Sequence, residues 1–152
     1  MKNSFYPEGV DLVWLASDQE DRVGAFITAG CGPIPLPALR TGHLLLEDVE
    51  PTVGKMSEIS EVRLLVSVKR PDDFVGLGKR GFFVFDWTDI YRKKADLIDA
   101  YEPVAIPSNP IRLDMLARGL METCTSLRLA GVSFADLAPL KIHRLVECAS
   151  PQ

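Results

Sequence analysis

The chain has 152 residues and a formal net charge of −4, with 47% hydrophobic and 25% charged residues. A chain of this length buries roughly 70% of its unfolded surface when it folds as one domain. This composition excludes a disordered chain, a collagen-like repeat and a coiled coil as the main architecture. We therefore predict one folded domain that spans residues 1–152.

The acidic residues are concentrated in the N-terminal part of the chain. Residues 1–62 hold ten acids and four bases, whereas residues 63–112 hold seven acids and nine bases. Net acidity argues against nucleic-acid binding as the main function, because such binding depends on Lys and Arg side chains that neutralise phosphates. The charge favours a protein partner with a neutral or basic surface.

The three cysteines, Cys31, Cys124 and Cys148, lie far apart and form no C-x-x-C pair. Their number and spacing support neither a disulfide framework nor a Cys-rich zinc site. The N-terminus lacks the apolar core of a signal peptide, and no apolar run approaches the length that spans a bilayer. We expect a cytoplasmic protein without a membrane span, a metal or another cofactor.

Two runs of strand-forming residues near the N-terminus, 10–17 and 22–29, are separated by the polar residues 18–21. This pattern predicts a β-hairpin. In the first run both alternating faces are apolar, which predicts a strand covered on both sides. Trp14 lies in this run, and we predict that its role is structural.

Three prolines at alternate positions follow in residues 30–37. Proline lacks a backbone N–H, so this segment predicts a stiff connecting loop rather than a central strand. After it, the spacing of apolar residues predicts a helix over residues 39–49 that ends before Pro51.

Residues 61–69 alternate between apolar and polar side chains and predict a half-covered strand. A proline followed by two acids at 71–73 predicts the start of a helix that ends at Gly78 or Gly81. The aromatic run at 82–87 predicts the next strand, and another is expected within 97–106.

The clearest helical spacing follows the turn at 107–110 and runs from Leu113 to Leu127. The segments 132–134 and 140–146 predict one or two last strands. Together these elements predict an α+β fold: a mostly antiparallel sheet of about five to six strands, with two to three helices packed on it as a single layer.

Residues Gly76 to Gly81 match the pattern G-x-G-x-x-G. In a dinucleotide-binding fold this pattern follows a strand and begins a helix. Here it follows a predicted helix and leads into the strand at 82–87. The reversed order favours a helix end and a turn.

A hydrolase is conceivable on the loop from Gly30 to Pro37, with Cys31 as nucleophile and His43 or His143 as base. The same loop is a candidate small-molecule site. An isolated cysteine is more often a small buried apolar residue than a nucleophile. We therefore favour a non-enzymatic function and expect no activity to depend on Cys31.

The acids Asp18, Glu20 and Asp21 crowd the predicted hairpin tip. Such a cluster keeps a turn solvated, binds a cation or contacts a partner. A calcium loop needs more ligands and a glycine at the turn, which this segment lacks. We therefore predict that Asp18, Glu20 and Asp21 are partner-binding residues.

Basic pairs and triplets at 69–70, 79–80 and 92–94 surround the aromatic strand. With Trp87 and Tyr91 as stacking rings, they would form a nucleic-acid-binding patch. The alternative is a charged rim around a sheet. The excess of acids over bases favours the rim.

The residues from Asp11 to Asp18 and from Ala25 to Pro35 resemble the start of small bacterial proteins found among polymorphic-toxin immunity genes. The resemblance comprises a strand, an acidic turn, a second strand and a Gly-Pro loop, and it assigns no site residue. It implies a protein that binds and neutralises a toxin domain. A protein-binding module is thus our main hypothesis, with a small-molecule-binding protein or hydrolase and a nucleic-acid-associated protein as alternatives.

Overall fold

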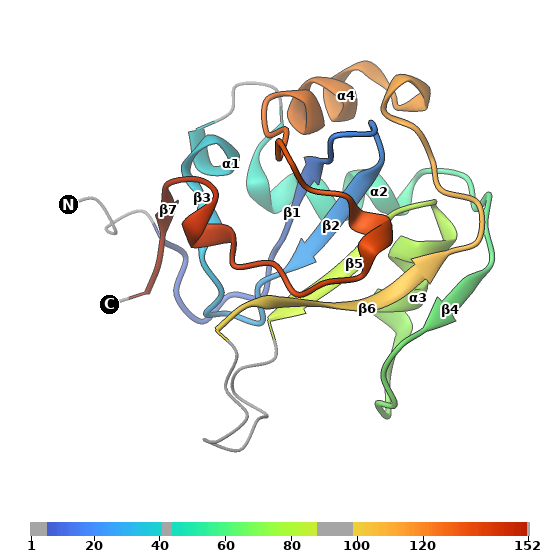
Figure 1. Cartoon of the computed structure of the whole chain (residues 1–152), viewed down its shortest axis with the longest axis horizontal. Helices are drawn as coiled ribbons and strands as arrows, with labels where there is room; N and C mark the ends of the chain where they lie inside the picture. The colour runs from blue at the N-terminus through green and yellow to red at the C-terminus, as the bar shows by residue number, and fades with distance from the viewer. Residues whose placement is uncertain (1–5, 41–43, 88–98, 152) are drawn as a thin grey trace.

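The period-two apolar runs become the strands of a five-stranded mixed sheet in the computed structural model, which describes residues 6–40, 44–87 and 99–151 (Figure 1). In spatial order the strands are β1 (Val13–Ser17), β2 (Val23–Ile27), β5 (Phe83–Trp87), β6 (Tyr101–Pro107) and β4 (Val62–Leu64). Only the β2–β5 pairing is parallel in this sheet. A second, two-stranded antiparallel sheet joins β3 (Ile34–Pro35) to β7 (Cys148–Ala149). The predicted α+β class is confirmed.

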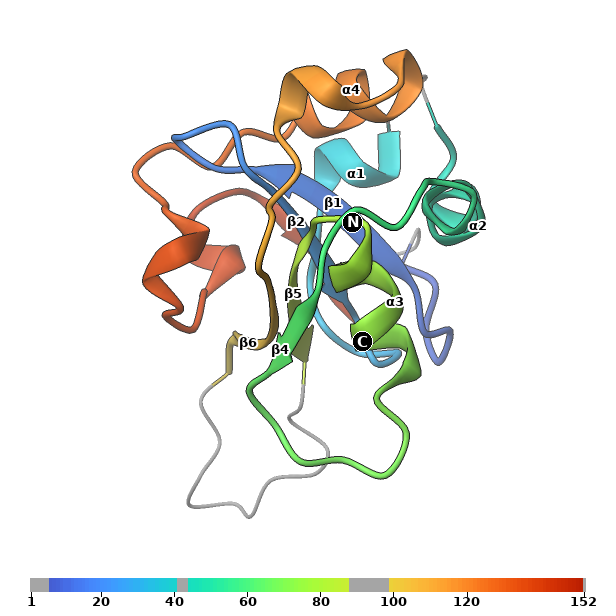
Figure 2. The same ribbon diagram turned by 90° about the vertical axis from the view of Figure 1, so that its right-hand side faces the viewer.

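The helices are short and are complemented by 3₁₀ turns. The α-helices are α1 (Leu36–Arg40), α2 (Val49–Gly54), α3 (Asp72–Lys79) and α4 (Arg118–Thr125). The 3₁₀ turns are η2 (Leu46–Asp48), η5 (Leu113–Met115), η6 (Phe134–Asp136) and η7 (Ile142–Arg144). Figure 2 shows α2 and α3 on one side of the sheet and the C-terminal segment, residues 127–151, on the other. None of the helices in the described ranges is long and apolar enough to cross a membrane.

The sheet separates two apolar cores, because neighbouring residues of a strand point to opposite faces. Trp14 and Ala16 pack towards the C-terminal segment, whereas Val13 and Leu15 pack towards the helices. All five residues of β1 are buried, as predicted for a strand covered on both sides.

Stacked aromatic rings form the centre of the first core, which lies between the sheet and the C-terminal segment. Trp14 stacks on Phe26 with ring centroids 4.1 Å apart, and Phe26 stacks on Phe85 at 4.8 Å. Tyr101 meets Trp14 edge-on, and its hydroxyl accepts a 3.1 Å hydrogen bond from Trp14 Nε1. Trp14 has no exposed surface, which places it in the core as predicted.

The predicted β1–β2 hairpin is confirmed, but the segment that follows it is more than a loop. Ile34 and Pro35 pair with the C-terminal strand β7, and Ile34 is completely buried. Proline is tolerated here because a two-stranded sheet has free outer edges. A Cβ atom at Gly32 would lie 2.5 Å from the Tyr101 hydroxyl, so the close approach of the loop to the core requires glycine.

The predicted helix over residues 39–49 is wrong. The chain instead forms η2 and then α2, which begins at Val49 and contains Pro51 in its first turn. Proline is accepted there because an N–H in the first turn has no partner within the helix. Residues 41–43 lie outside the described residues.

Three other segments that were predicted to be strands differ from the structure. The strand predicted at 61–69 ends at Leu64, beside a register shift between Val84 and Phe85 of β5. The segments predicted as strands at 132–134 and 140–146 form the 3₁₀ turns η6 and η7, although Leu140 still pairs with Tyr101 in an isolated antiparallel bridge. These turns still bury Phe134 and Ile142, so the apolar pattern there marked burial and not extended backbone.

The helix predicted after Pro71 is α3, and Gly81 follows its end with a φ angle of 96°. A Cβ atom at Gly78 would lie 2.8 Å from both methyl groups of Val62. Both glycines are therefore required by the structure: Gly81 forms a left-handed turn, and Gly78 allows a close helix–strand contact. The interpretation of the glycine pattern as a helix end is confirmed.

Candidate functional site

The tip of the β1–β2 hairpin is a three-residue loop closed by Asp18 and Arg22. The Asp18 N–H donates to the Arg22 carbonyl at 3.0 Å, and Asp21 has a φ angle of 63°. Aspartate tolerates this left-handed conformation better than most residues do. The loop therefore has a defined shape that its own sequence favours.

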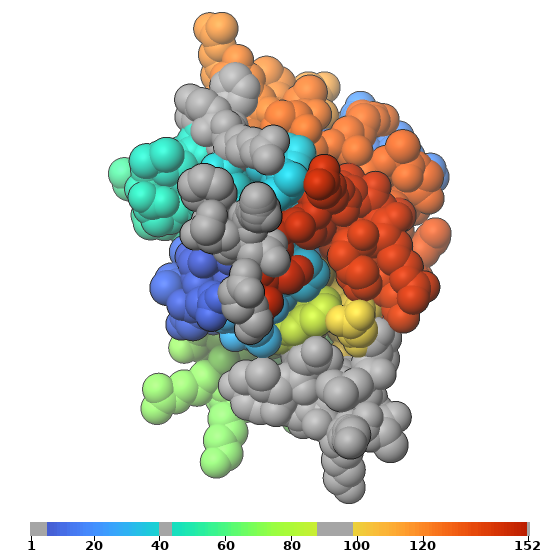
Figure 3. Space-filling view, turned by 90° about the vertical axis from the view of Figure 1, so that its left-hand side faces the viewer, coloured from blue at the N-terminus to red at the C-terminus, as the bar shows by residue number. Residues whose placement is uncertain are grey.

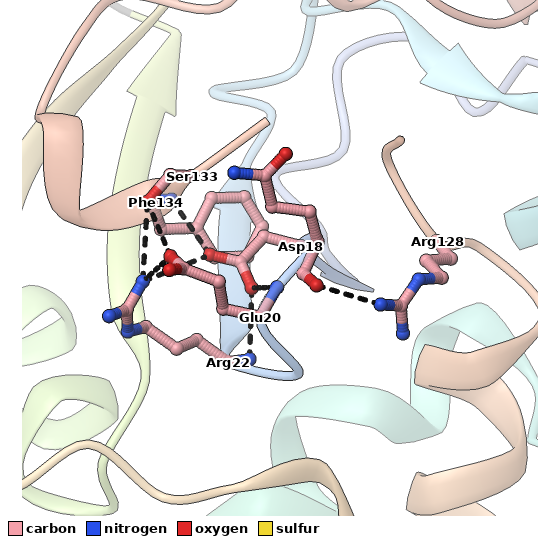
Figure 4. A network of polar contacts seen from close by, with 7 residues as sticks. Asp18, Glu20, Arg22, Arg128, Ser133 and Phe134 are labelled. Atoms are coloured by element: carbon pink, nitrogen blue, oxygen red, sulfur yellow. Dashed lines mark hydrogen bonds and ion pairs between the residues drawn. The ribbon is translucent and has the colours of Figure 1, made fainter. Parts of the chain in front are cut away.

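Asp18 lies inside the protein, although the sequence predicts that it contacts a partner. Its side chain is fully buried, and one oxygen, Oδ1, accepts the N–H groups of Glu20 and Arg22, each at 2.9 Å. The other oxygen accepts the N–H of Phe134 at 2.9 Å (Figure 4). The carboxylate thus ties the hairpin tip to η6 and is not available to a partner.

Glu20 is exposed at the tip but is held in place by its neighbours. Its carboxylate pairs with the Arg22 guanidinium and accepts a 2.9 Å hydrogen bond from the Ser133 hydroxyl. The hydrogen bond from Ser133 lowers the pKa of Glu20, and Arg22 adds to this effect. Half of the side chain, 49%, is exposed.

Asp21 forms an ion pair with Arg128, whose guanidinium also donates to the Gln19 carbonyl at 2.8 Å. The three acids at the tip are therefore accompanied by two arginines, a formal sum of −1. The acidic excess seen in the sequence does not create a strong negative field here, because Arg22 of the hairpin and the distant Arg128 supply compensating charge.

A third segment completes this surface. The Asp21 carbonyl accepts the Leu113 N–H at 2.9 Å, and Arg22 forms an isolated β-bridge with Arg112. This places η5 beside the tip, and the Met115 side chain of η5 is 62% exposed. We define the hairpin-tip surface by the following residues: Glu20, Asp21, Arg22, Arg112, Met115, Arg128 and Ser133.

The sequence indicated two members of the hairpin-tip surface, Glu20 and Asp21. Reasoning from the sequence missed Arg112, Met115 and Arg128, which lie about 90 to 110 positions away and show no local pattern. Methionine and arginine are enriched at protein interfaces. The surface therefore combines charged groups of both signs with one exposed apolar side chain.

The loop from Gly30 to Pro37 is part of the packed interior. The Tyr6 hydroxyl donates to the Gly32 carbonyl, and the Tyr101 hydroxyl donates to the Pro33 carbonyl at 2.8 Å. Cys31 is half-buried, and His143 lies 3.4 Å from Asp99, measured from Nε2 to Oδ2. His43 lies outside the described residues, and the expectation that Cys31 is not catalytic stays a prediction.

A metal site has no support in the described residues, where no group of three His, Cys, Asp or Glu side chains could hold an ion. The structure has a pocket of about 160 Å³. Figure 3 shows the side of the molecule on which the first described residues (blue), α1 (cyan) and α2 (teal) lie. The pocket is lined by Pro7, Leu12, Ala38, Leu39, Leu45, Leu46 and Glu47. Sites for drug-sized ligands usually have about 300–1,000 Å³, so this pocket is too small for one.

The nucleic-acid patch, the less favoured alternative in the sequence, does not form around Trp87, whose side chain is buried. Arg80 is occupied as well, because its guanidinium donates to the carbonyls of Gly54, Met56 and Gly76. Lys69 and Arg70 are exposed, and residues 91–94 lie outside the described residues. The arrangement fits a charged rim better than a stacking platform.

Asp86, near the end of β5, is a buried carboxyl group that sequence reasoning overlooked. It is 8% exposed, and burial raises its pKa from 3.8 to about 7, with a further contribution from Asp11. The folded protein therefore holds this proton more tightly than the unfolded chain does. The resulting stability is present below the ordinary pKa of 3.8 and is lost as the pH rises through about 7.

We expect Asp86→Asn to remove this pH dependence. At pH 8 the variant should exceed the wild type by about 2 kcal/mol in free energy of unfolding, because it need not bury a charge. At pH 4 the two proteins should differ little. Urea unfolding at both pH values measures the difference, and an equal difference at the two pH values would show that Asp86 titrates normally.

No protein-family model, curated protein or solved structure matches the chain.

Proposed function

We propose that the protein is a protein-binding module and that the hairpin-tip surface contacts its partner. One observation carries this proposal: a fully buried carboxylate, Asp18, holds an exposed turn in one conformation. Burying a carboxylate is unfavourable unless its hydrogen bonds are satisfied, and a turn that only faces solvent needs no such anchor. The anchor is useful where the exposed groups must have fixed positions.

Fixed positions favour binding because fewer side chains must be ordered when the complex forms. The ion pairs of Arg22 and Arg128 hold the tip carboxylates, and the exposed Met115 provides an apolar contact beside them. The proposed partner therefore has a small apolar pocket flanked by charges of both signs.

A toxin domain is our specific proposal for this partner. It is supported by the resemblance of residues 11–18 and 25–35 to immunity-type proteins. A cytoplasmic location belongs to the same proposal and agrees with three cysteines that are all free, as is usual in a reducing compartment. Co-expression with the product of the adjacent gene is the direct test of this specific version.

We expect Met115→Asp to weaken partner binding at least about 30-fold, because charging an apolar hot-spot residue of an interface costs about 2 kcal/mol or more of binding free energy. Affinity capture from the source cells, with quantitative mass spectrometry, compares the variant with the wild type. The matched control is Val10→Asp, since Val10 is 50% exposed at another place. If both variants retain the same specific proteins as the wild type, the hairpin-tip surface is not the binding site.

A further inference from the structure

Among the described residues, strand β4 ends the strand order of the main sheet and pairs with β6 alone. Every second residue of this segment is hydrogen-bonded to the β6 side. The Ser108 N–H donates to the Glu61 carbonyl, and the Leu65 N–H donates to the Val104 carbonyl, each at 2.9 Å. By the antiparallel pattern, the N–H and C=O groups of the intervening Val62 and Leu64 point away from β6. Figure 1 places β4 at the right-hand edge, and Figure 2, which faces that side, shows no helix or strand across it.

The residues after β4 keep the pattern of a strand although they leave the sheet. Leu65 is 37% exposed and Val68 is 47% exposed, while Val66 is half-buried. The ladder ends where the β5–β6 register shifts between Val84 and Phe85, and such irregularities increase the local twist. Within the described part of the chain, the strand-forming residues 66–69 thus pair with no strand, although Val66 packs against the helix-side core.

We propose that residues 61–69 of two copies of this protein pair as antiparallel strands across a two-fold axis. Leu65 of one copy then lies opposite Leu65 of the other. The even-numbered residues, whose backbone groups point outwards in β4, form the hydrogen bonds between the copies. The segment from Leu65 to Lys69 extends when it pairs, which lengthens the edge strand.

The segment is complementary to itself in this register. Glu61 faces Lys69 of the second copy, and Arg63 faces Ser67. The remaining pairs are apolar: Val62 faces Val68, and Leu64 faces Val66. Shifting the register so that Arg63 faces itself would place like charges opposite each other, which is unfavourable in a sheet. Charge complementarity therefore selects the register centred on Leu65.

Such a contact involves nine residues on each side, so the dimer should be weak, with dissociation in the micromolar range. The paired strand β4 and the edge strand β1 lie at opposite ends of the strand order. Dimerisation would leave the hairpin-tip surface of each copy accessible. The proposal is therefore independent of the proposed protein-binding function.

Cysteine cross-linking tests the register. Leu65→Cys places two thiols at a facing pair that forms no hydrogen bonds, where Cα atoms are about 4.5 Å apart and a disulfide can form. Arg63→Cys is the matched control on the same strand, because its proposed neighbour is Ser67. Under mild oxidation we expect a covalent dimer from Leu65→Cys only, above any background from native cysteines in the wild type. Equal cross-linking of both variants, or of Arg63→Cys alone, would overturn the proposal.

Charge exchange tests the same contact without cross-linking. Sedimentation equilibrium should show that Glu61→Lys and Lys69→Glu each weaken the dimer about tenfold, because two facing pairs become repulsive. The double variant Glu61→Lys/Lys69→Glu should restore it. Leu65→Lys should abolish the dimer, whereas Leu145→Lys, at a leucine that is 46% exposed elsewhere, should not. A monomeric wild type at high micromolar concentration, or a double variant that stays weak, contradicts the proposal.

Discussion

Replacing Asp18 with asparagine should lower the free energy of unfolding by about 2–4 kcal/mol. The carboxylate accepts three backbone N–H groups, from Glu20, Arg22 and Phe134. An asparagine has the same shape but only one accepting oxygen, so its amide group would face a donor. At least one buried N–H would lose its partner, and the tip would separate from η6.

Asp21→Asn is the matched control for this substitution. It makes the same chemical change three residues further along the hairpin. The Asp21 side chain is exposed, and its ion pair with Arg128 is a surface contact. Asparagine also tolerates the left-handed backbone at this position. We expect a change below about 1 kcal/mol. Urea unfolding of both variants measures the contrast, and equal stabilities would mean that Asp18 is not the anchor of the tip.

Trp14→Ala should lower the free energy of unfolding by about 3–5 kcal/mol, which is enough to unfold much of a marginally stable domain. The side chain is completely buried and contacts Phe26 and Tyr101. Its removal leaves a large cavity in the centre of the first core and a buried Tyr101 hydroxyl without its donor. We expect circular dichroism to show a large loss of thermal stability.

Trp14→Phe separates the two contributions. Phenylalanine keeps an apolar ring beside Phe26 but lacks the indole N–H that donates to Tyr101. Its cost should be smaller than that of Trp14→Ala, about 1–3 kcal/mol. A Trp14→Ala protein that melts with the wild type would show that Trp14 is not in the core.

The elements predicted well from the sequence are those in which apolar periodicity and local turn chemistry agree. The β1–β2 hairpin has two runs of strand-forming residues and a polar turn, and β5 carries an aromatic residue at every second position. In α3 the early acids and the final glycine mark both ends. Each of these signals lies within a few residues of the element that it defines.

The C-terminal segment was predicted poorly because its backbone conformation depends on contacts with the rest of the protein. Phe134 and Ile142 are buried against a sheet formed earlier in the chain, and their backbone turns in 3₁₀ geometry. Short apolar runs do not distinguish an extended strand from such buried turns.

In the candidate site, too, the sequence predicted features that depend on neighbouring residues and missed those that depend on residues far away in the chain. The sequence located the acidic tip, since Glu20 and Asp21 stand in a recognisable turn. It did not reveal that Asp18 is an internal anchor, because its third donor, Phe134, is 116 positions away. Of the two arginines that balance the tip, Arg22 belongs to the hairpin, but Arg128 is 107 positions away from its partner Asp21, so the charge of this surface could not be read from the hairpin alone.

The most direct test of the proposed function is photo-crosslinking from position 115 in living source cells. A photoreactive phenylalanine analogue replaces Met115 in one strain and Val10, which is similarly exposed, in another. We expect one abundant adduct with a specific protein from position 115 and none with that protein from position 10. The Asp18→Asn substitution should weaken the adduct, because it releases the tip. The same adduct from both positions, or no adduct at position 115, would contradict binding through the hairpin-tip surface.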